Sequence, residues 1–86
     1  MVQIIENQAE IGGIVEEVEA DGIRVRVDRV RAVAGFPNLA DDAEGESVTI
    51  AMGSVTGVTP GQRVAVRVRK TAIDRYAAIP DTITVE

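Results

Sequence analysis

The side chains of this sequence that can do chemistry are carboxylates and guanidinium groups, because the chain contains neither histidine nor cysteine. Without these residues there is no imidazole base near neutral pH, no thiolate nucleophile, no disulfide and no ordinary catalytic zinc site. A Ser-His-Asp mechanism is excluded for the same reason. Two carboxylates can still exchange protons as a pair, but no spacing in the sequence marks such a pair. We therefore expect a protein that is not an enzyme and that holds no cofactor and no metal.

Four arginines at alternate positions in two segments are candidates for binding an anion. They are Arg24, Arg26, Arg67 and Arg69. If the two segments lie close together as strands, these residues form a basic stripe, and proteins bind single-stranded nucleic acid through such a groove plus aromatic stacking platforms. The chain has only two aromatic residues, Phe36 and Tyr76, and neither lies on the basic segments. Pairing of the arginines with glutamates is the alternative, so we do not expect nucleic acid to be the main partner.

The segment 34–39 contains the only phenylalanine and the only leucine of the chain. Two roles are open for it. Phe36 and Leu39 can plug one end of the folded domain. Alternatively, the segment is an exposed tip that contacts a protein partner, since binding residues concentrate on loops and aromatic residues dominate interfaces. The candidate contact residues of this tip are Phe36, Pro37, Asn38 and Leu39.

An acidic segment follows directly, with carboxylates at Asp41, Asp42, Glu44 and Glu46. Carboxylate oxygens are ligands for hard cations such as Ca²⁺, but the spacing of an EF-hand loop is absent. A solvated acidic loop is the simpler interpretation. Acidic and basic segments alternate along the whole chain, so strands that become neighbours would place opposite charges across their ladders, which helps to fix register.

The chain has 86 residues and a formal net charge of −5. This length predicts one small domain, residues 1–86. An acidic balance disfavours non-specific binding to nucleic acid or to anionic lipid. The first residues lack the basic and apolar regions of a secretory signal, and no apolar run approaches the roughly 18 residues of a membrane span. We therefore expect no membrane interaction and, by default, a cytoplasmic location.

Strands dominate the predicted secondary structure, because the chain has 14 valines and 9 isoleucines against a single leucine. Branched side chains favour a pleated, half-buried surface. Three segments alternate between apolar and polar residues, which is typical of a strand with one wet face: 23–28, 47–52 and 63–69. The residues predicted to form the core are Val15, Val18, Val25, Val27, Val48, Ile50, Val64, Val66 and Val68.

The spacing within 11–19 fits either a helix or a bent strand, and Gly12 and Gly13 count against the helix. We interpret 13–19 as a strand with a bulge at Glu16-Glu17 and a hairpin turn at Asp21-Gly22. A bulge or bend near Asp28-Arg29 accounts for a change of phase in the next strand. These bends suit a small barrel.

The remaining segments carry weaker signals. Pro60-Gly61 predicts a type II turn. Residues 2–5 and 82–85 are short strand candidates at the ends of the chain, and 38–43 has room for one helical turn. Residues 70–79 are expected to form a short helix or an irregular crossing that ends before Pro80.

Two segments resemble OB barrels. Residues 13–27, Gly-Ile-Val-Glu-Glu-Val-Glu-Ala-Asp-Gly-Ile-Arg-Val-Arg-Val, are similar to the opening hairpin of these barrels, with two inward valines three residues apart before a glycine-containing turn. Residues 58–69, Val-Thr-Pro-Gly-Gln-Arg-Val-Ala-Val-Arg-Val-Arg, resemble a late strand, and their Pro-Gly-Gln turn is similar to that of transport-associated OB modules of ABC transporters. SH3-like barrels share these patterns, so the resemblance implies a small barrel and assigns no ligand-binding residues.

The sequence thus predicts an all-β protein with a five-stranded OB-like barrel, or an SH3-like barrel, and one long loop or short helical turn. The first functional hypothesis is a non-catalytic binding or assembly module that acts through protein–protein contacts, as an oligomer or as a structural component, for example of a phage or another complex. The second is an OB-type binder of single-stranded nucleic acid or of a small anionic ligand.

Overall fold

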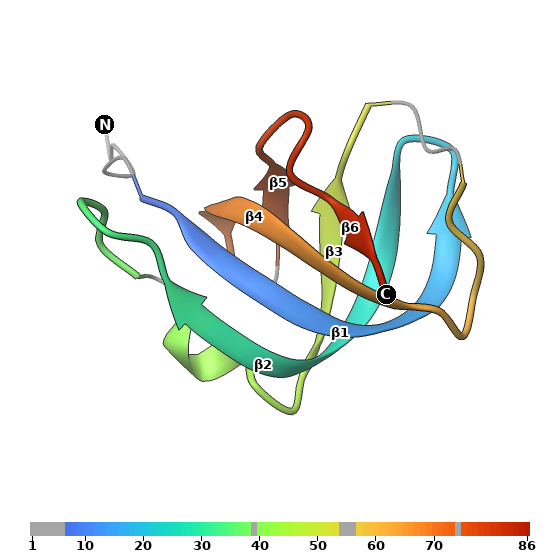
Figure 1. Ribbon diagram of the computed structural model, residues 1–86, viewed down its shortest axis with the longest axis horizontal. Helices are drawn as coiled ribbons and strands as arrows, with labels where there is room; N and C mark the ends of the chain where they lie inside the picture. Colours follow the sequence, from blue (N-terminus) through green and yellow to red (C-terminus); the bar gives the residue numbers. More distant parts are fainter. Residues whose placement is uncertain (1–6, 39, 54–56, 74) are drawn as a thin grey trace.

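A computed structural model describes residues 7–38, 40–53, 57–73 and 75–86, and in it the chain forms a closed five-stranded β-barrel with one extra strand (Figure 1). This confirms the predicted all-β fold and is compatible with a small OB-like barrel. A single 3₁₀ turn, η1, is the only helix in the described residues, and no helix there is long and apolar enough to cross a membrane. The elements are β1 (Ala9–Glu19), β2 (Gly22–Ala32), η1 (Asp41–Ala43), β3 (Ser47–Ala51), β4 (Arg63–Ala72), β5 (Arg75–Ala78) and β6 (Thr84–Val85).

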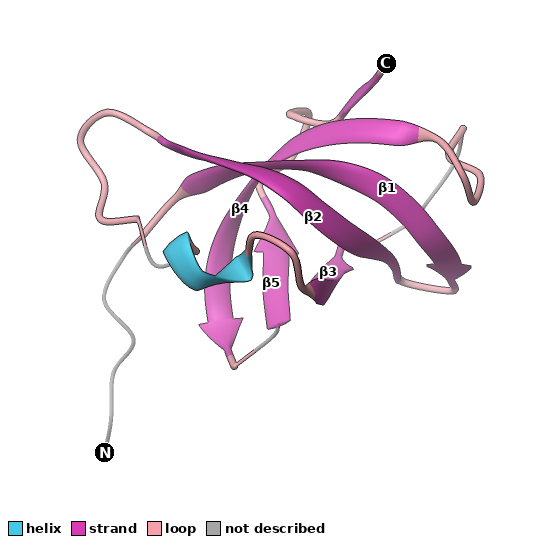
Figure 2. Ribbon diagram, turned by 90° about the horizontal axis from the view of Figure 1, so that it is seen from below, coloured by secondary structure: helices cyan, strands magenta, loops and turns pink. Residues whose placement is uncertain are grey.

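The barrel closes in the order β1-β2-β3-β5-β4, because β1 pairs with both β2 and β4. All of these pairings are antiparallel except that of β3 with β5, which is parallel. Strands β5 and β6 pair with the same edge of β4. Strand β6 pairs at Val64 and Ala65, and β5 pairs further along, from Val68 to Ala72. In Figure 2 the short turn η1 lies below the long ribbon of β1 and β2.

The core fills the inside of the barrel with branched aliphatic side chains. Eight of the nine predicted core residues are buried, whereas Val18, near the turn between β1 and β2, is only half-buried and packs against the core. The core also contains residues that the strand patterns did not identify as such: Ala9, Ile11, Ala40, Ala43 and Tyr76. Ala40 and Ala43 bring η1 against the barrel, which confirms the single helical turn predicted within 38–43.

Both predicted bulges are present in the long β1–β2 ribbon. The register shifts between Val15 and Glu17, and again between Gly12 and Gly13, where Asp28 of β2 is left without a partner on β1. A Cβ added at Gly13 would lie 2.1 Å from the carbonyl oxygen of Arg26. The glycine therefore allows the two backbones to approach closely where the ribbon bends.

The predicted turns are also present. Strands β1 and β2 pair as far as Glu19 and Gly22, so the turn itself consists of Ala20 and Asp21. The Pro60-Gly61 turn has Gly61 at a φ of 90°, as position i+2 of a type II turn requires, and the N–H of Gln62 donates to the carbonyl of Thr59 at 3.2 Å.

One prediction for the second half of the chain is wrong. Residues 70–79 form neither a helix nor an irregular crossing, because β4 continues to Ala72 and a hairpin returns the chain as β5. The buried Tyr76 pairs with Ile50 on one side and Lys70 on the other, so the tertiary pairing overrides the weak local signal. Of the predicted end strands, 82–85 is reduced to Thr84–Val85, and 2–5 lies outside the described residues.

Candidate binding site

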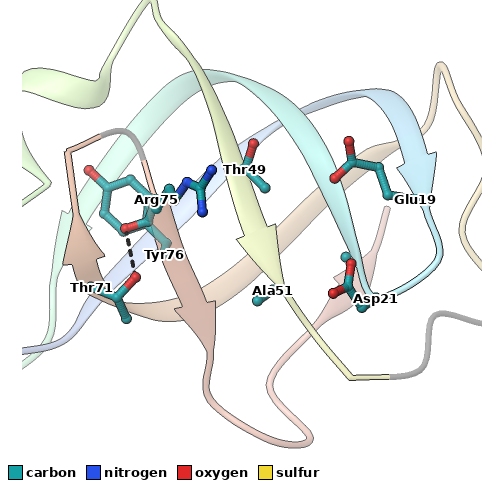
Figure 3. Close-up of a pocket in the computed structure, with 8 residues that line it drawn as sticks. Glu19, Asp21, Thr49, Ala51, Thr71, Arg75 and Tyr76 are labelled. Carbon is teal, nitrogen blue, oxygen red and sulfur yellow. Dashed lines mark hydrogen bonds between the residues drawn. The ribbon is translucent and has the colours of Figure 1, made fainter.

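A hollow of about 370 Å³ opens on the outer surface of the barrel alongside β3 (Figure 3). Three groups of residues line it. The β1–β2 hairpin provides one wall, β3 provides the floor, and the β4–β5 hairpin provides the other wall. The lining residues are Glu19, Asp21, Gly22, Thr49, Ala51, Thr71, Arg75 and Tyr76.

The strands β2 and β3 approach each other closely beside the floor of the hollow. Gly22 of β2 pairs with Ala51 of β3, and a Cβ at Gly22 would lie 2.3 Å from the carbonyl oxygen of Ile50. The main-chain N–H of Met52 donates to the carbonyl of Asp21 at 2.8 Å, which fixes the hairpin turn against the end of β3. The glycine therefore allows the backbones of β2 and β3 to approach each other closely at this point of the sheet.

The two walls carry opposite charges. Arg75 pairs in register with Thr49, and Figure 3 shows Glu19 and Asp21 on the other side of β3 from Arg75. Within the described part of the chain, none of these three charged side chains belongs to an ion pair. The hollow thus has a basic end and an acidic end, and both are available to a ligand.

The predicted basic stripe is not continuous. Arg24 and Arg26 of β2 pair with Thr49 and Ser47 of β3. On β4, Arg67 pairs with Glu10 of β1, whereas Arg69 pairs with Ala77 of β5. Because β1 separates β2 from β4 on one side and β3 with β5 separates them on the other, the four arginines do not form one groove.

The structure instead forms a row of Arg24, Thr49 and Arg75 across β2, β3 and β5. Arg75 is not among the predicted site residues, because it stands in the segment 70–79 that was expected to be a helix or a crossing. Strand β5 has only the four residues Arg75–Ala78, which are too few to establish a strand by pattern alone.

Most arginines outside the hollow are paired, as the alternating charge segments predicted. Glu10 and Arg31 face each other across β1 and β2 with a separation of 3.9 Å between Oε1 and Nη1. Arg63 Nη1 lies 2.7 Å from Asp28 Oδ2, and Arg29 Nη2 lies 3.4 Å from Glu86 Oε1. Arg24 also has a partner, because its Nε lies 3.9 Å from Glu16 Oε1. These pairs are solvent-exposed, so they remove free positive charge from the surface while contributing little stability.

The loop with the candidate contact residues follows the far end of β2 and lies away from the hollow. Phe36 is half-buried and outside the core, so it does not plug the barrel; Ala40 and Ala43 occupy the core instead. Pro37 is exposed. Asn38 accepts a hydrogen bond from the N–H of Ala40 at 2.9 Å and donates one to Asp41 at 2.8 Å. Leu39 lies outside the described residues. The role of this loop in partner binding stays a prediction.

The acidic segment is solvated. Asp41, Asp42, Glu44 and Glu46 are all exposed. Asp42 lies 3.9 Å from the Nζ of Lys70, and the described residues contain no group of carboxylates arranged to hold a metal ion.

Comparisons of the chain with protein-family models, with curated proteins and with solved structures gave no match. The hollow alongside β3 has an acidic end, a basic end and a floor of small residues.

Proposed function

We propose that the protein is a non-catalytic binding or assembly module of OB type that acts through protein–protein contacts on the face formed by β2, β3 and β5. The order β1-β2-β3-β5-β4, with β3 parallel to β5, supports the OB assignment over an SH3-like barrel. In OB barrels the face of strands 2 and 3 and the loops after strands 1 and 4 bind ligands. The hollow occupies the corresponding position.

The observation that carries the proposal is the composition of this hollow. Small side chains form its floor. Glu19 and Asp21 lie on one wall, and Arg75 lies on the other. The combination suits a protein surface, which presents both signs of charge, better than a polyanion, which the two carboxylates would repel.

Site-directed photo-crosslinking tests the proposal. A benzophenone amino acid placed at Thr49 in the hollow is expected to cross-link to a protein when the chain is produced in its source cells. The same group at the exposed Pro37 examines the alternative contact loop. Cross-linking at Pro37 alone would move the contact to that loop, and cross-linking at neither position would contradict the proposal.

An OB-type binder of single-stranded nucleic acid or of a small anion is the second candidate, and the row of Arg24, Thr49 and Arg75 favours it. Against it, Tyr76 is the only aromatic residue lining the hollow, and it is only 3% exposed, so no stacking platform is available there.

We expect no binding of a fluorescent oligothymidylate tighter than about 100 μM at physiological salt, measured by anisotropy. Sub-micromolar binding that weakens with salt and is lost in Arg75→Ala would establish the second candidate instead.

A further inference from the structure

We propose that the partner on this face is a second copy of the same chain, bound as a two-fold symmetric dimer. This inference rests on the proposed function and adds the identity of the partner. It is carried by the distribution of charge on the two walls of the hollow and by an exposed isoleucine in the β4–β5 hairpin.

The charges are self-complementary. A two-fold axis through the floor of the hollow, near Thr49 and Ala51, exchanges the two walls. It places Arg75 of one copy opposite Glu19 and Asp21 of the other, and the reverse contact forms at the same time. A two-fold interface requires this reciprocity, because each patch must complement itself. A face with a single sign of charge would repel its own copy.

The floor of the hollow and the β4–β5 hairpin add packing. Thr49 and Ala51 line the floor with short side chains, so another surface can approach the sheet closely there. Ile73 lies in the β4–β5 hairpin between the lining residues Thr71 and Arg75, and it is 84% exposed. Only one other large hydrophobic side chain in the described chain is exposed, Val85 at 42%, and β6 does not contribute to the hollow. Burial of Ile73 against the partner would remove the larger apolar exposure from water.

The dimer also suits the size of the protein. A chain of 86 residues without cysteine has no disulfide to support its small core. Association is one of the few remaining ways to stabilise such a domain.

A charge-swap experiment tests this arrangement in the intact chain. Sedimentation or light scattering over a concentration series gives the dimer dissociation constant. Arg75→Glu alone, and Glu19→Arg with Asp21→Arg, should each weaken the homodimer at least about tenfold, because both symmetric contacts then oppose like charges. An equimolar mixture of the two variants should regain an affinity close to that of the original chain, since both contacts of the heterodimer are again between opposite charges.

Ile73→Ser should also weaken the dimer, whereas Val85→Ser and Phe36→Ser should leave it unchanged. Circular dichroism confirms that each variant is folded. A chain that is still monomeric at about 1 mM, a concentration at which even a weak dimer is populated, would overturn the inference. A dimer dissociation constant that the charge swaps leave unchanged, or that Phe36→Ser raises instead, would overturn it as well. A monomer whose Thr49 cross-links to a different protein would overturn the dimer and leave the proposed function standing.

Discussion

At the scale of single residues, Asn7 has the clearest structural role, because its side chain replaces a missing piece of strand. It is only 4% exposed. Its Oδ1 accepts from the N–H of Lys70 at 2.8 Å, and its Nδ2 donates to the carbonyl of the same residue at 3.4 Å. Strand β1 begins only at Ala9, so the amide extends the pairing with β4 beyond the end of the strand. Nothing in the sequence pattern identifies this, since Asn7 stands outside every apolar alternation.

Asn7→Leu should therefore lower the free energy of unfolding by about 1–3 kcal/mol, because a main-chain donor and acceptor of β4 lose their partners. Urea denaturation measures the change. Gln8→Ala is the control: the bond from Gln8 to Pro37 uses the main-chain N–H, so this change should stay within about 0.5 kcal/mol. Equal losses in the two variants would show that the amide has no special role.

The two adjacent glycines of β1 offer a second test at this scale. A Cβ at Gly13 would meet the main-chain oxygen of Arg26 at 2.1 Å, whereas a Cβ at Gly12 would meet only the flexible end of the Arg29 side chain, at 3.2 Å. We expect Gly13→Ala to destabilise the fold by more than about 2 kcal/mol, since the backbones of β1 and β2 must separate. Gly12→Ala should cost less than about 1 kcal/mol, because Arg29 can move and the unfolded chain loses entropy. Thermal melts compare the two, and the reverse order would contradict the described register.

At the scale of elements, the strands that alternate for six or seven residues were predictable from the sequence, and so were the two bulges. Each of these features repeats or shifts a period of two within one continuous segment. Strand β5 was not predictable, because it has four residues and exists through its parallel pairing with β3 and its antiparallel pairing with β4. A parallel neighbour that is distant in sequence leaves no local pattern, and this is why Arg75 was missed.

Thr82 lies between β5 and β6 and contacts the edge of β4 in the gap between these two strands. Its hydroxyl accepts from the N–H of Arg67 at 3.2 Å and donates to the carbonyl of Ile79 at 2.7 Å. The turn between the two strands contains Asp81 at a φ of 63°, a conformation that few non-glycine residues adopt. The side chain thus supplies the hydrogen bond that the main chain cannot make across this turn.

Thr82→Val keeps the shape of the side chain but removes the hydroxyl, so we expect a loss of about 1 kcal/mol and faster release of β6 from β4. Amide hydrogen exchange reports this directly: protection should fall at Arg67, and at Glu86, whose N–H donates to Arg63 at 2.8 Å. Thr84→Val, on the exposed face of β6, is the matched control and should preserve protection at both amides. Unchanged exchange at Arg67 in the Thr82 variant would rule out this role.

At the scale of the whole molecule, the candidate site exists only once the barrel has closed. The hairpin turn that contains Asp21 and the alternating segment that contains Thr49 could be identified in the sequence. Their convergence on one hollow could not, because it depends on β3 lying between the ends of two hairpins from different parts of the chain. All five barrel strands contribute to one core, so we expect the barrel to unfold as a single cooperative unit.

Val66 faces the inside of this barrel, whereas Thr49 faces its outer surface. Val66 is 1% exposed and lies on β4, which pairs with β1, β5 and β6. Val66→Ala should lower the free energy of unfolding by about 1–3 kcal/mol through lost apolar burial and a residual cavity. In a domain of this size each kcal/mol corresponds to roughly 4–8 °C in melting temperature. Thr49→Ala, on the outer face, should change the stability by no more than about 0.5 kcal/mol.

Because the sheet is closed, the loss at Val66 should appear equally by circular dichroism and by tyrosine fluorescence of Tyr76, in one transition. Two separate transitions would mean that the β1–β2 ribbon folds without β4, and equal effects at the two positions would mean that the assignment of inner and outer faces is wrong.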